Sequence, residues 1–285
     1  MTITALDHIA LVVRDLDATL DGYSRLFGRT PNWRGADGGA HHAWYQFGNT
    51  ALDIIAPTGE GHTGSQVARQ LADHGEGIWA LAFATDDMAA ERGRIERLAM
   101  PSSEPLPIRS THPETGEKRR WLTSVIAPAA SHGVNLFLIE QKPDTAIWPN
   151  SEAQGQEAAA ISGLDHVVVS TRHPNRAAAL YGARLGLDFK LDRTNPDWGT
   201  RLMFFKVGDL VVEVAHRLKD EPNDDPDSFW GLTWRAPDVD AAHARIAASG
   251  FEVSECRAGR KPGTRVFTIK NAPAGIPTLI LGAAQ

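Results

Sequence analysis

The sequence contains a single cysteine, Cys256, among its 285 residues. One cysteine excludes an intramolecular disulfide and any zinc site built from thiolates, and it is typical of a reducing compartment such as the cytoplasm. The chain has no apolar run long enough to span a membrane, and its first residues do not predict a signal peptide. Basic residues are outnumbered, 29 against 35 acidic ones, so the net charge of −6 disfavours nucleic acid or an anionic membrane as a partner.

Glycine fingerprints for nucleotides, a nucleophile elbow and a His-Glu-x-x-His zinc motif are absent too. What the chain does contain is an internal repeat. The Leu-Asp-His segment at His8 recurs at His166, 158 positions later, and a second repeat that begins at Trp79 and Trp230 has an offset of 151. The chain therefore divides into four units, named A, B, A′ and B′ in chain order, at about 6–56, 78–141, 164–216 and 229–282.

Each unit is expected to contain one strand, one helix and three further strands. An apolar run that ends at an acid, as in residues 9–13 before Asp15, predicts a strand followed by a helix N-cap. Gly28, Gly186 and Gly250 lie where helices should end, because glycine adopts the left-handed conformation that closes many helices. Short apolar segments separated by glycine turns predict hairpins. Sheets covered by helices in this way predict an α+β fold.

The length fits two domains of ordinary size, each a pair of units. The predicted domains are 1–141 and 164–285, and residues 142–163, with their prolines and small residues, are the predicted linker. Residues 101–120 predict the longest irregular stretch, and they carry several basic side chains. Such a loop is either a lid that attracts an acidic substrate or a solvated surface loop.

Together these features resemble the vicinal oxygen chelate superfamily, which includes glyoxalase I, extradiol ring-cleaving dioxygenases, methylmalonyl-CoA epimerase, fosfomycin-resistance enzymes and bleomycin-binding proteins. The resemblance rests on the Leu-Asp-His start at His8, its echo at His166, the repeated order of elements and the acidic pair after Phe83. It covers nearly the whole chain. It implies two glyoxalase-like domains built as half-open sheet cups, with a divalent metal held by ligands from the first and last strands of a unit.

Carried over position by position, the resemblance implies four metal ligands from units A and A′: His8, Asp53, His166 and Glu213. The corresponding positions of B and B′ hold Ala80, Phe137, Gly231 and Leu279, which do not bind metals. If consecutive units pack together, each cup has two protein ligands, fewer than a catalytic zinc or a non-haem iron requires. If A packs on A′, within the chain or between subunits, all four converge and suit Fe, Mn, Ni, Co or Zn.

Side-chain alternation along the strands predicts that His8 shares a face with Ala10, and Asp53 with Ala51. Burying a carboxylate in an apolar strand costs free energy unless a cation or a hydrogen-bond donor lies beside it. Asp53 and Glu213 are therefore expected to have such a partner. The alternative is structural, because a histidine at a strand start can also cap backbone groups or fill a half-buried site.

Two side chains of unit A are candidate catalytic groups. His42 could enter the cup as an acid–base group or an auxiliary ligand, and Tyr45 could donate its hydroxyl to a substrate oxygen. Both also fit a packing role.

Two classes of function follow. One is a metal-dependent lyase or isomerase that acts on a small oxygenated substrate, and this substrate is aromatic if the eight tryptophans line its site. An extradiol dioxygenase is a variant of this class, but Gly231 and Leu279 at the ligand positions of B′ argue against it. The other is a metal-free protein that binds or sequesters a small molecule. A homodimer fits either class.

Overall fold

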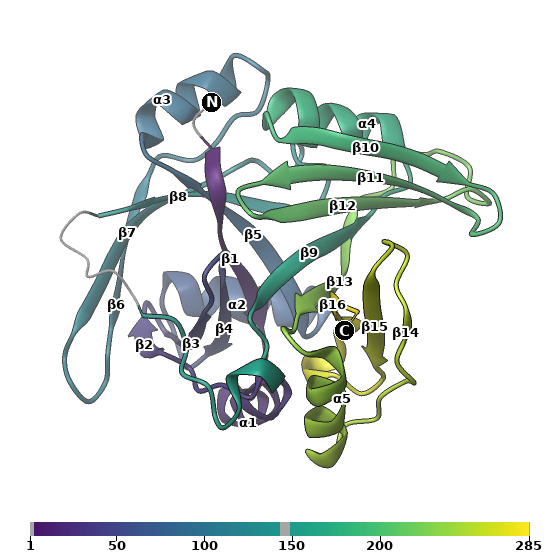
Figure 1. Cartoon of the computed structure of the whole chain (residues 1–285). Helices are drawn as coiled ribbons and strands as arrows, with labels where there is room; N and C mark the ends of the chain where they lie inside the picture. The colour runs from purple at the N-terminus through teal and green to yellow at the C-terminus, as the bar shows by residue number, and fades with distance from the viewer. Residues whose placement is uncertain (1–2, 143–148, 285) are drawn as a thin grey trace.

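The computed structural model describes residues 3–142 and 149–284 and contains two eight-stranded sheets, each built from two consecutive units (Figure 1). Every unit has the predicted order of elements, so the expected α+β repeat is confirmed. Unit A comprises β1 (Ile3–Val12), α1 (Leu16–Phe27), β2 (Trp33–Asp37), β3 (Ala40–Gln46) and β4 (Ala51–Pro57). Helix α2 (His62–His74) follows, and unit B comprises β5 (Gly77–Thr85), α3 (Met88–Glu96), β6 (Leu106–Thr111), β7 (Lys118–Val125) and β8 (Asn135–Gln141).

The second half begins after a short 3-10 helix, η1 (Glu157–Ala159). Unit A′ comprises β9 (Gly163–Ser170), α4 (Pro174–Ala178), the π-helix η2 (Ala179–Arg184), β10 (Asp188–Asn195), β11 (Thr200–Val207) and β12 (Leu210–Arg217). Unit B′ comprises β13 (Ser228–Arg235), α5 (Val239–Ala248), β14 (Arg257–Ala258), β15 (Thr264–Ile269), η3 (Pro273–Gly275) and β16 (Thr278–Ala283). None of the helices in the described part of the chain has the length and apolar character needed to cross a bilayer.

Aspartates cap three of the helices, as the sequence predicts. The Asp15 carboxylate accepts a hydrogen bond from the backbone N–H of Ala18 at 3.0 Å, and Asp238 caps α5 in the same way. In unit B the cap is Asp87. Gly28 follows α1 with φ 63°, a left-handed conformation that places its N–H on a carbonyl of the last turn. Local chemistry therefore fixes where these helices begin and end.

The first sheet closes into a barrel. Its strand order is β1-β4-β3-β2-β6-β7-β8-β5, and the antiparallel pairing of β1 with β5 and the bridge between Ala36 and Thr111 join the two units at both sides. Strands β6 and β7 pair along their lengths, so the prediction of an irregular stretch over 101–120 is wrong for 106–111 and 118–120, whereas 101–105 and 112–117 lie outside the strands. A proline and several charged residues hide the alternation of a strand there, and pairing on both sides supplies the order.

The barrel interior is filled. Ala10, Val12, Ala51 and Ile55 face it, as the predicted alternation of faces requires, and Ile9 and Leu11 lie in the other core. Helix α2 contacts β4, β1 and β3 and adds apolar side chains to the same cluster. Three tryptophans occupy the remaining space: Trp33, Trp44 and Trp121.

The second sheet stays open, with the order β10-β11-β12-β9-β13-β16-β15-β14. Alternate residues of β12 are buried on the face that packs against α4 and belong to the core, whereas Val211, Glu213 and Ala215 are half-buried on the opposite face. That opposite, concave face is called here the open cup. Of the two half-open cups expected, one is therefore a closed barrel and the other is open.

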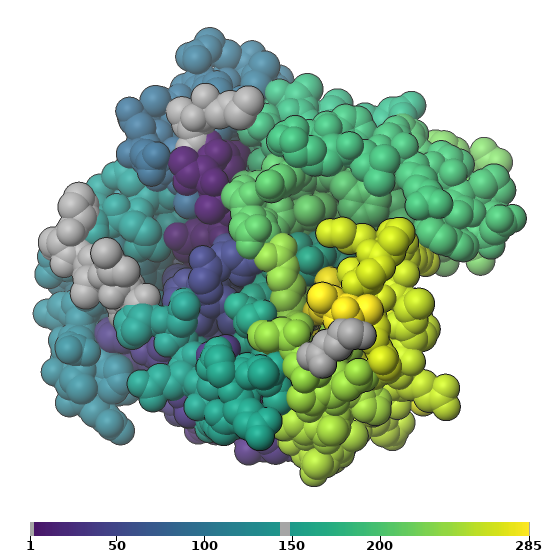
Figure 2. Space-filling view, viewed as in Figure 1, coloured from purple at the N-terminus to yellow at the C-terminus, as the bar shows by residue number. Residues whose placement is uncertain are grey.

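The two halves share one hydrophobic core. The Phe27 ring lies 4.7 Å from the Trp234 ring, centroid to centroid, and Phe47 packs on the same indole. The described part of the predicted linker, 149–163, lies between the halves and contributes Ile161 to this core (Figure 2). Residues 143–148 of that prediction lie outside the described residues.

Arginines at helix ends reinforce the junction. Arg245 of α5 donates to the carbonyls of Arg25 and Leu26 at the end of α1, and Arg94 of α3 donates to the carbonyls of Arg184 and Leu185. Arg94 and Arg245 are 151 positions apart, the offset of the B and B′ repeat. Because carbonyls at a helix C-terminus carry partial negative charge, each cation stabilises a helix of the other half.

Candidate functional site

The four predicted ligands lie in two different sheets. Unit A pairs with B through β1 and β5, and A′ pairs with B′ through β9 and β13, so the packing of A on A′ within the chain is wrong. Consecutive units join because each first strand offers its free edge to the next first strand. In the described part of the chain, no three His, Cys, Asp or Glu side chains cluster closely enough to hold a metal ion.

In the barrel, Asp53 bonds to His42 and not to a predicted ligand partner. His42 Nδ1 is 2.9 Å from Asp53 Oδ1, and His42 Nε2 is 2.6 Å from Ser110 Oγ. The Trp33 indole N–H donates to the same hydroxyl at 2.8 Å. These contacts have the order of a Ser-His-Asp triad, but Ser110 is fully buried. A substrate cannot reach this hydroxyl, so the network serves to satisfy the hydrogen bonds of polar groups that are buried inside the barrel.

Arg119 adds a positive charge to this interior. Its guanidinium carbon lies 4.5 Å from the centroid of the Trp44 ring, and the side chain is almost fully buried. Burial lowers the pKa of Arg119, whereas the charges of Asp53 and Asp7 raise it. The buried carboxylate of Asp53 is thus offset by a cation and by the imidazole of His42, the compensation that the sequence requires.

His8 is buried in the same barrel. Its Nδ1 lies 2.7 Å from Asp7 Oδ1, and its ring packs on Trp44 with centroids 4.8 Å apart. Tyr45 faces the other way, because its hydroxyl donates to the carbonyl of Leu20 in α1 at 2.9 Å. Burial raises the pKa of Tyr45 to about 12. The hydroxyl therefore belongs to the interface with α1 and does not face the barrel interior.

The open cup brings the other two predicted ligands together. His166 lies on β9 and Glu213 on the adjacent β12, which pair in parallel. His166 Nε2 is 3.5 Å from Glu213 Oε2, and the side chains are 17% and 13% exposed. On the far side of the ring, Asp165 Oδ1 is 2.9 Å from His166 Nδ1, and Arg235 donates to the other Asp165 oxygen at 3.0 Å.

The protonation of this group follows from its partners. Burial would raise the pKa of Asp165, but the hydrogen bonds from His166 and Arg235 outweigh it and lower that pKa. An ionised carboxylate can only accept hydrogen bonds, so His166 Nδ1 carries a hydrogen and its N–H donates a hydrogen bond to Asp165. Nε2 is then the nitrogen that faces Glu213, and burial raises the pKa of the Glu213 carboxyl against the charges of His166 and Arg260.

This donor pair fits a divalent metal in kind. Two acceptors that face each other need a proton or a cation between them, and a histidine whose second nitrogen donates to a carboxylate is the usual form of a metal ligand. The cup supplies two protein ligands, fewer than a catalytic metal site usually has, because Gly231 and Leu279 occupy the ligand positions of B′. Sequence reasoning missed the role of Asp165, although the repeated Leu-Asp-His segment contains it.

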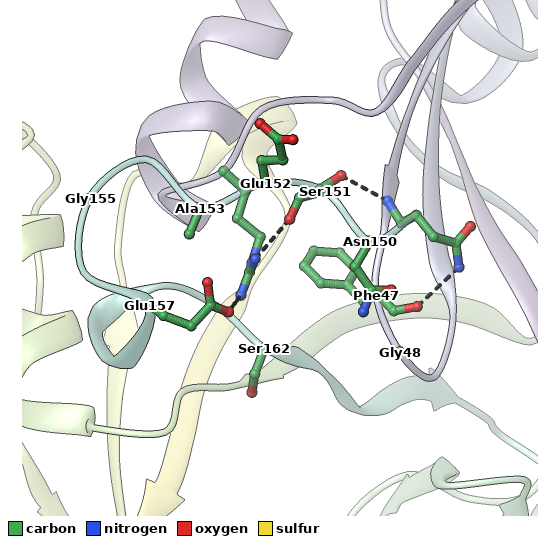
Figure 3. A pocket seen from close by; sticks show the side chains of 11 residues that line it. Phe47, Gly48, Asn150, Ser151, Glu152, Ala153, Gly155, Glu157 and Ser162 are labelled. Carbon is green, nitrogen blue, oxygen red and sulfur yellow. Dashed lines mark hydrogen bonds and ion pairs between the residues drawn. The ribbon is translucent and has the colours of Figure 1, made fainter. Parts of the chain in front are cut away.

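A separate cavity of about 570 Å³ lies where residues 149–163 meet the turn after β3 (Figure 3). Arg29 lines it and donates to the carbonyls of Ile161 and Ser151, and it also pairs with Glu157. All three guanidinium nitrogens therefore form hydrogen bonds within the chain, so the role of Arg29 in this cavity is structural.

Comparisons with known proteins agree with the repeat. Residues 6–163 match the family model described as a glyoxalase-like domain, and residues 165–268 match the model of the glyoxalase/bleomycin resistance protein/dioxygenase superfamily. No curated protein matches the sequence.

Among solved structures, a mutant of 4-hydroxymandelate synthase from Streptomyces coelicolor is similar with a TM-score of 0.71 and 14% identity, covering 100% of this chain and 94% of that one. The Mn(II)-bound glyoxalase from Novosphingobium aromaticivorans has a TM-score of 0.66 and 14% identity, covering 99% and 82%. A hypothetical protein from Staphylococcus aureus has a TM-score of 0.63 and 10% identity, covering 98% and 100%. At these identities the likeness establishes the fold alone.

Proposed function

Because the chain belongs to the glyoxalase/bleomycin resistance/dioxygenase superfamily, we propose that it is a divalent-metal enzyme acting on a small oxygenated substrate. The proposed active site is the open cup, and His166 and Glu213 are its metal ligands. The proposed reaction is that of a glyoxalase-like lyase or isomerase. The proposed metal is one of Fe, Mn, Ni, Co and Zn, which all accept imidazole and carboxylate ligands.

One observation carries this proposal: the 3.5 Å approach of His166 Nε2 to Glu213 Oε2 on an open face. Asp165 holds the imidazole through Nδ1, so that Nε2 points at the carboxylate. The barrel offers nothing equivalent, because tryptophans and α2 fill its interior and Asp53 is already bonded to His42.

Two protein ligands leave room for a substrate with two adjacent oxygens. A bound divalent cation would supply a Lewis acid that polarises a carbonyl or stabilises an enediolate. The chain itself orients the ligands through Asp165 and Arg235, and the half-buried position of Glu213 strengthens every charge interaction in the cup. We therefore expect metal to bind weakly alone and more tightly with a two-oxygen ligand.

A metal-free binding protein is the second candidate, and the donor number of two favours it. In that case a proton shared by His166 and Glu213 replaces the cation. An extradiol dioxygenase is less well supported, because it uses two histidines and one carboxylate on one face, and B′ supplies Gly231 and Leu279 instead.

Metal content of the purified chain separates these functions. The protein is dialysed against each of the five metals, with and without catechol as a two-oxygen ligand, and bound metal is measured by mass spectrometry. We expect about one ion per chain, lost in His166→Ala and Glu213→Gln, with an affinity about tenfold lower in Asp165→Asn. His62→Ala, in the exposed start of α2, is the matched control and should retain the ion.

Loss of the ion in His8→Ala but not in His166→Ala would place the metal in the barrel and contradict the proposal. No bound ion under any loading condition would favour the metal-free binding protein.

A further inference from the structure

Three side chains form a clasp over the open cup. The Arg193 guanidinium carbon lies 4.9 Å from the centroid of the Trp198 ring, and that of Arg260 lies 4.2 Å from it. Arg193 is on β10, Trp198 is in the turn before β11, and Arg260 is in the loop between β14 and β15. The clasp therefore joins the two edges of the open sheet, where the β10–β11 hairpin reaches toward the β14–β15 hairpin (Figure 1).

Neither guanidinium group of the clasp forms an ion pair in the described part of the chain, and the carboxyl group on which the charge of Arg260 acts is that of Glu213. In the described part of the chain, no carboxylate lies within ion-pair distance of Arg193 or Arg260, whereas nearby Arg201 and Arg265 pair with Asp192 and Asp240. Two like charges that share one indole repel each other, and a cation–π contact at an exposed site offsets only about 0.5–1 kcal/mol. An anion between them would remove the repulsion. This positive site belongs to a chain with a net charge of −6.

An apolar surface runs from the clasp to the proposed metal ligands. A β-bulge at Lys190 turns Leu191 onto the face of the open cup, where it lies opposite Phe204. Phe204 in turn lies opposite Glu213 on β12. Leu191 is 49% exposed, a high value for a large apolar side chain in a strand. The row from Leu191 through Phe204 to Glu213 therefore offers an apolar floor with a carboxylate at its inner end.

We propose that Arg193, Trp198 and Arg260 bind the oxyanion group of an organic anion whose apolar body covers Leu191 and Phe204. This specifies the substrate class of the proposed function and rests on it for the location of the reacting end, near Glu213. Carboxylates and phosphate monoesters share the required chemistry, because a guanidinium binds both through paired N–H donors.

Isothermal titration calorimetry of the full chain in buffer with a chelator tests this proposal without any metal. The probes are 3-phenylpropionate, its neutral amide with the same apolar body, and phenyl phosphate. We expect the better-bound anion to exceed the amide by at least about tenfold in affinity, and the difference to shrink as salt rises. Whichever of the two anions binds more tightly identifies the oxyanion.

Variants assign the effect to the clasp. Arg193→Gln and Arg260→Gln should each lower anion affinity about fivefold or more and leave amide affinity unchanged. Trp198→Phe should retain binding and Trp198→Ala should lose it, because the ring face is what both guanidinium groups contact. Arg217→Gln is the matched control, since Arg217 lies on β12 of the same sheet and pairs with Asp220.

Equal affinity for anion and amide, or equal losses in Arg193→Gln and Arg217→Gln, would overturn the proposal. The chelator separates the two proposals, because 3-phenylpropionate binding is measured without metal and metal content is measured without 3-phenylpropionate. Metal binding without anion discrimination would leave the proposed function standing and remove only the clasp.

Discussion

Replacing Arg245 should destabilise the junction between the two halves more than any exposed arginine does. Its guanidinium donates to the carbonyls of Ala159, Arg25 and Leu26, and Arg245→Met keeps the apolar stem but removes these bonds. A bond from a charged donor contributes about 1.5–3 kcal/mol, and three that act as a unit add less than their sum. Burial lowers the pKa of Arg245, so desolvation of the charge offsets part of the gain. We expect a loss of about 2–4 kcal/mol in the free energy of unfolding.

Arg25→Met is the matched control, because Arg25 donates across the same junction to the carbonyl of Ser249 but is 47% exposed. It should cost under about 1 kcal/mol. Urea unfolding is followed by tryptophan fluorescence, which senses Trp234 at the junction, and by circular dichroism. The shared core predicts one transition with coincident midpoints by both probes. Equal losses in the two variants, or two separate transitions in the unaltered chain, would refute this account of the junction.

Two further predictions concern the barrel and the pH dependence of stability. A Cβ on Gly35 would lie 1.9 Å from Ser110 Oγ, so Gly35→Ala should cost about 1–3 kcal/mol in thermal or urea unfolding. Gly93→Ala, inside α3 with its Cβ 3.7 Å from Arg97, should instead gain about 0.5–1 kcal/mol, and a loss there equal to that of Gly35→Ala would contradict the packing argument. Burial raises the pKa of Asp227 in spite of its bonds to Thr171 and Arg176. The folded state then holds this proton more tightly than the unfolded state, so the contribution of Asp227 falls as pH rises from its ordinary value of 3.8 toward the raised pKa. Unfolding free energies measured from pH 3.5 to 7 should therefore shift in favour of Asp227→Asn as pH rises, and a constant difference between the two proteins would contradict it.

Much of the architecture follows from the sequence. Repeats locate the four units, the aspartates mark helix starts, and alternation separates Ala10 from Ile9. These features depend on neighbours along the chain or on one strand pair, so local chemistry determines them. The presence of a glyoxalase-like fold in both halves is confirmed by the family models.

The candidate site could be predicted only in part, because it depends on packing between distant segments. His8 and His166 follow the same three-residue pattern, yet one is buried beside Trp44 and the other faces Glu213. That difference arises from α2 and from the closure of β2 on β6. The residues around the two histidines carry no sequence signal of either feature. The two partners of Trp198 are Arg193 on β10 and Arg260 in the loop after β14, and no local pattern in the sequence predicts the contact with Arg260.

The closure of one sheet and not the other also determines where this chain is vulnerable to aggregation. In the first sheet β2 and β6 meet at the bridge between Ala36 and Thr111, which shortens the exposed edges, whereas β10 and β14 end the second sheet with free N–H and C=O groups. Strand β14 is only two residues long, and β10 carries Lys190, Asp192 and Arg193 along its length. Brevity and charge therefore protect the open half from intermolecular pairing, and neutralising those side chains would leave the edge of β10 open to pairing with a strand of another molecule.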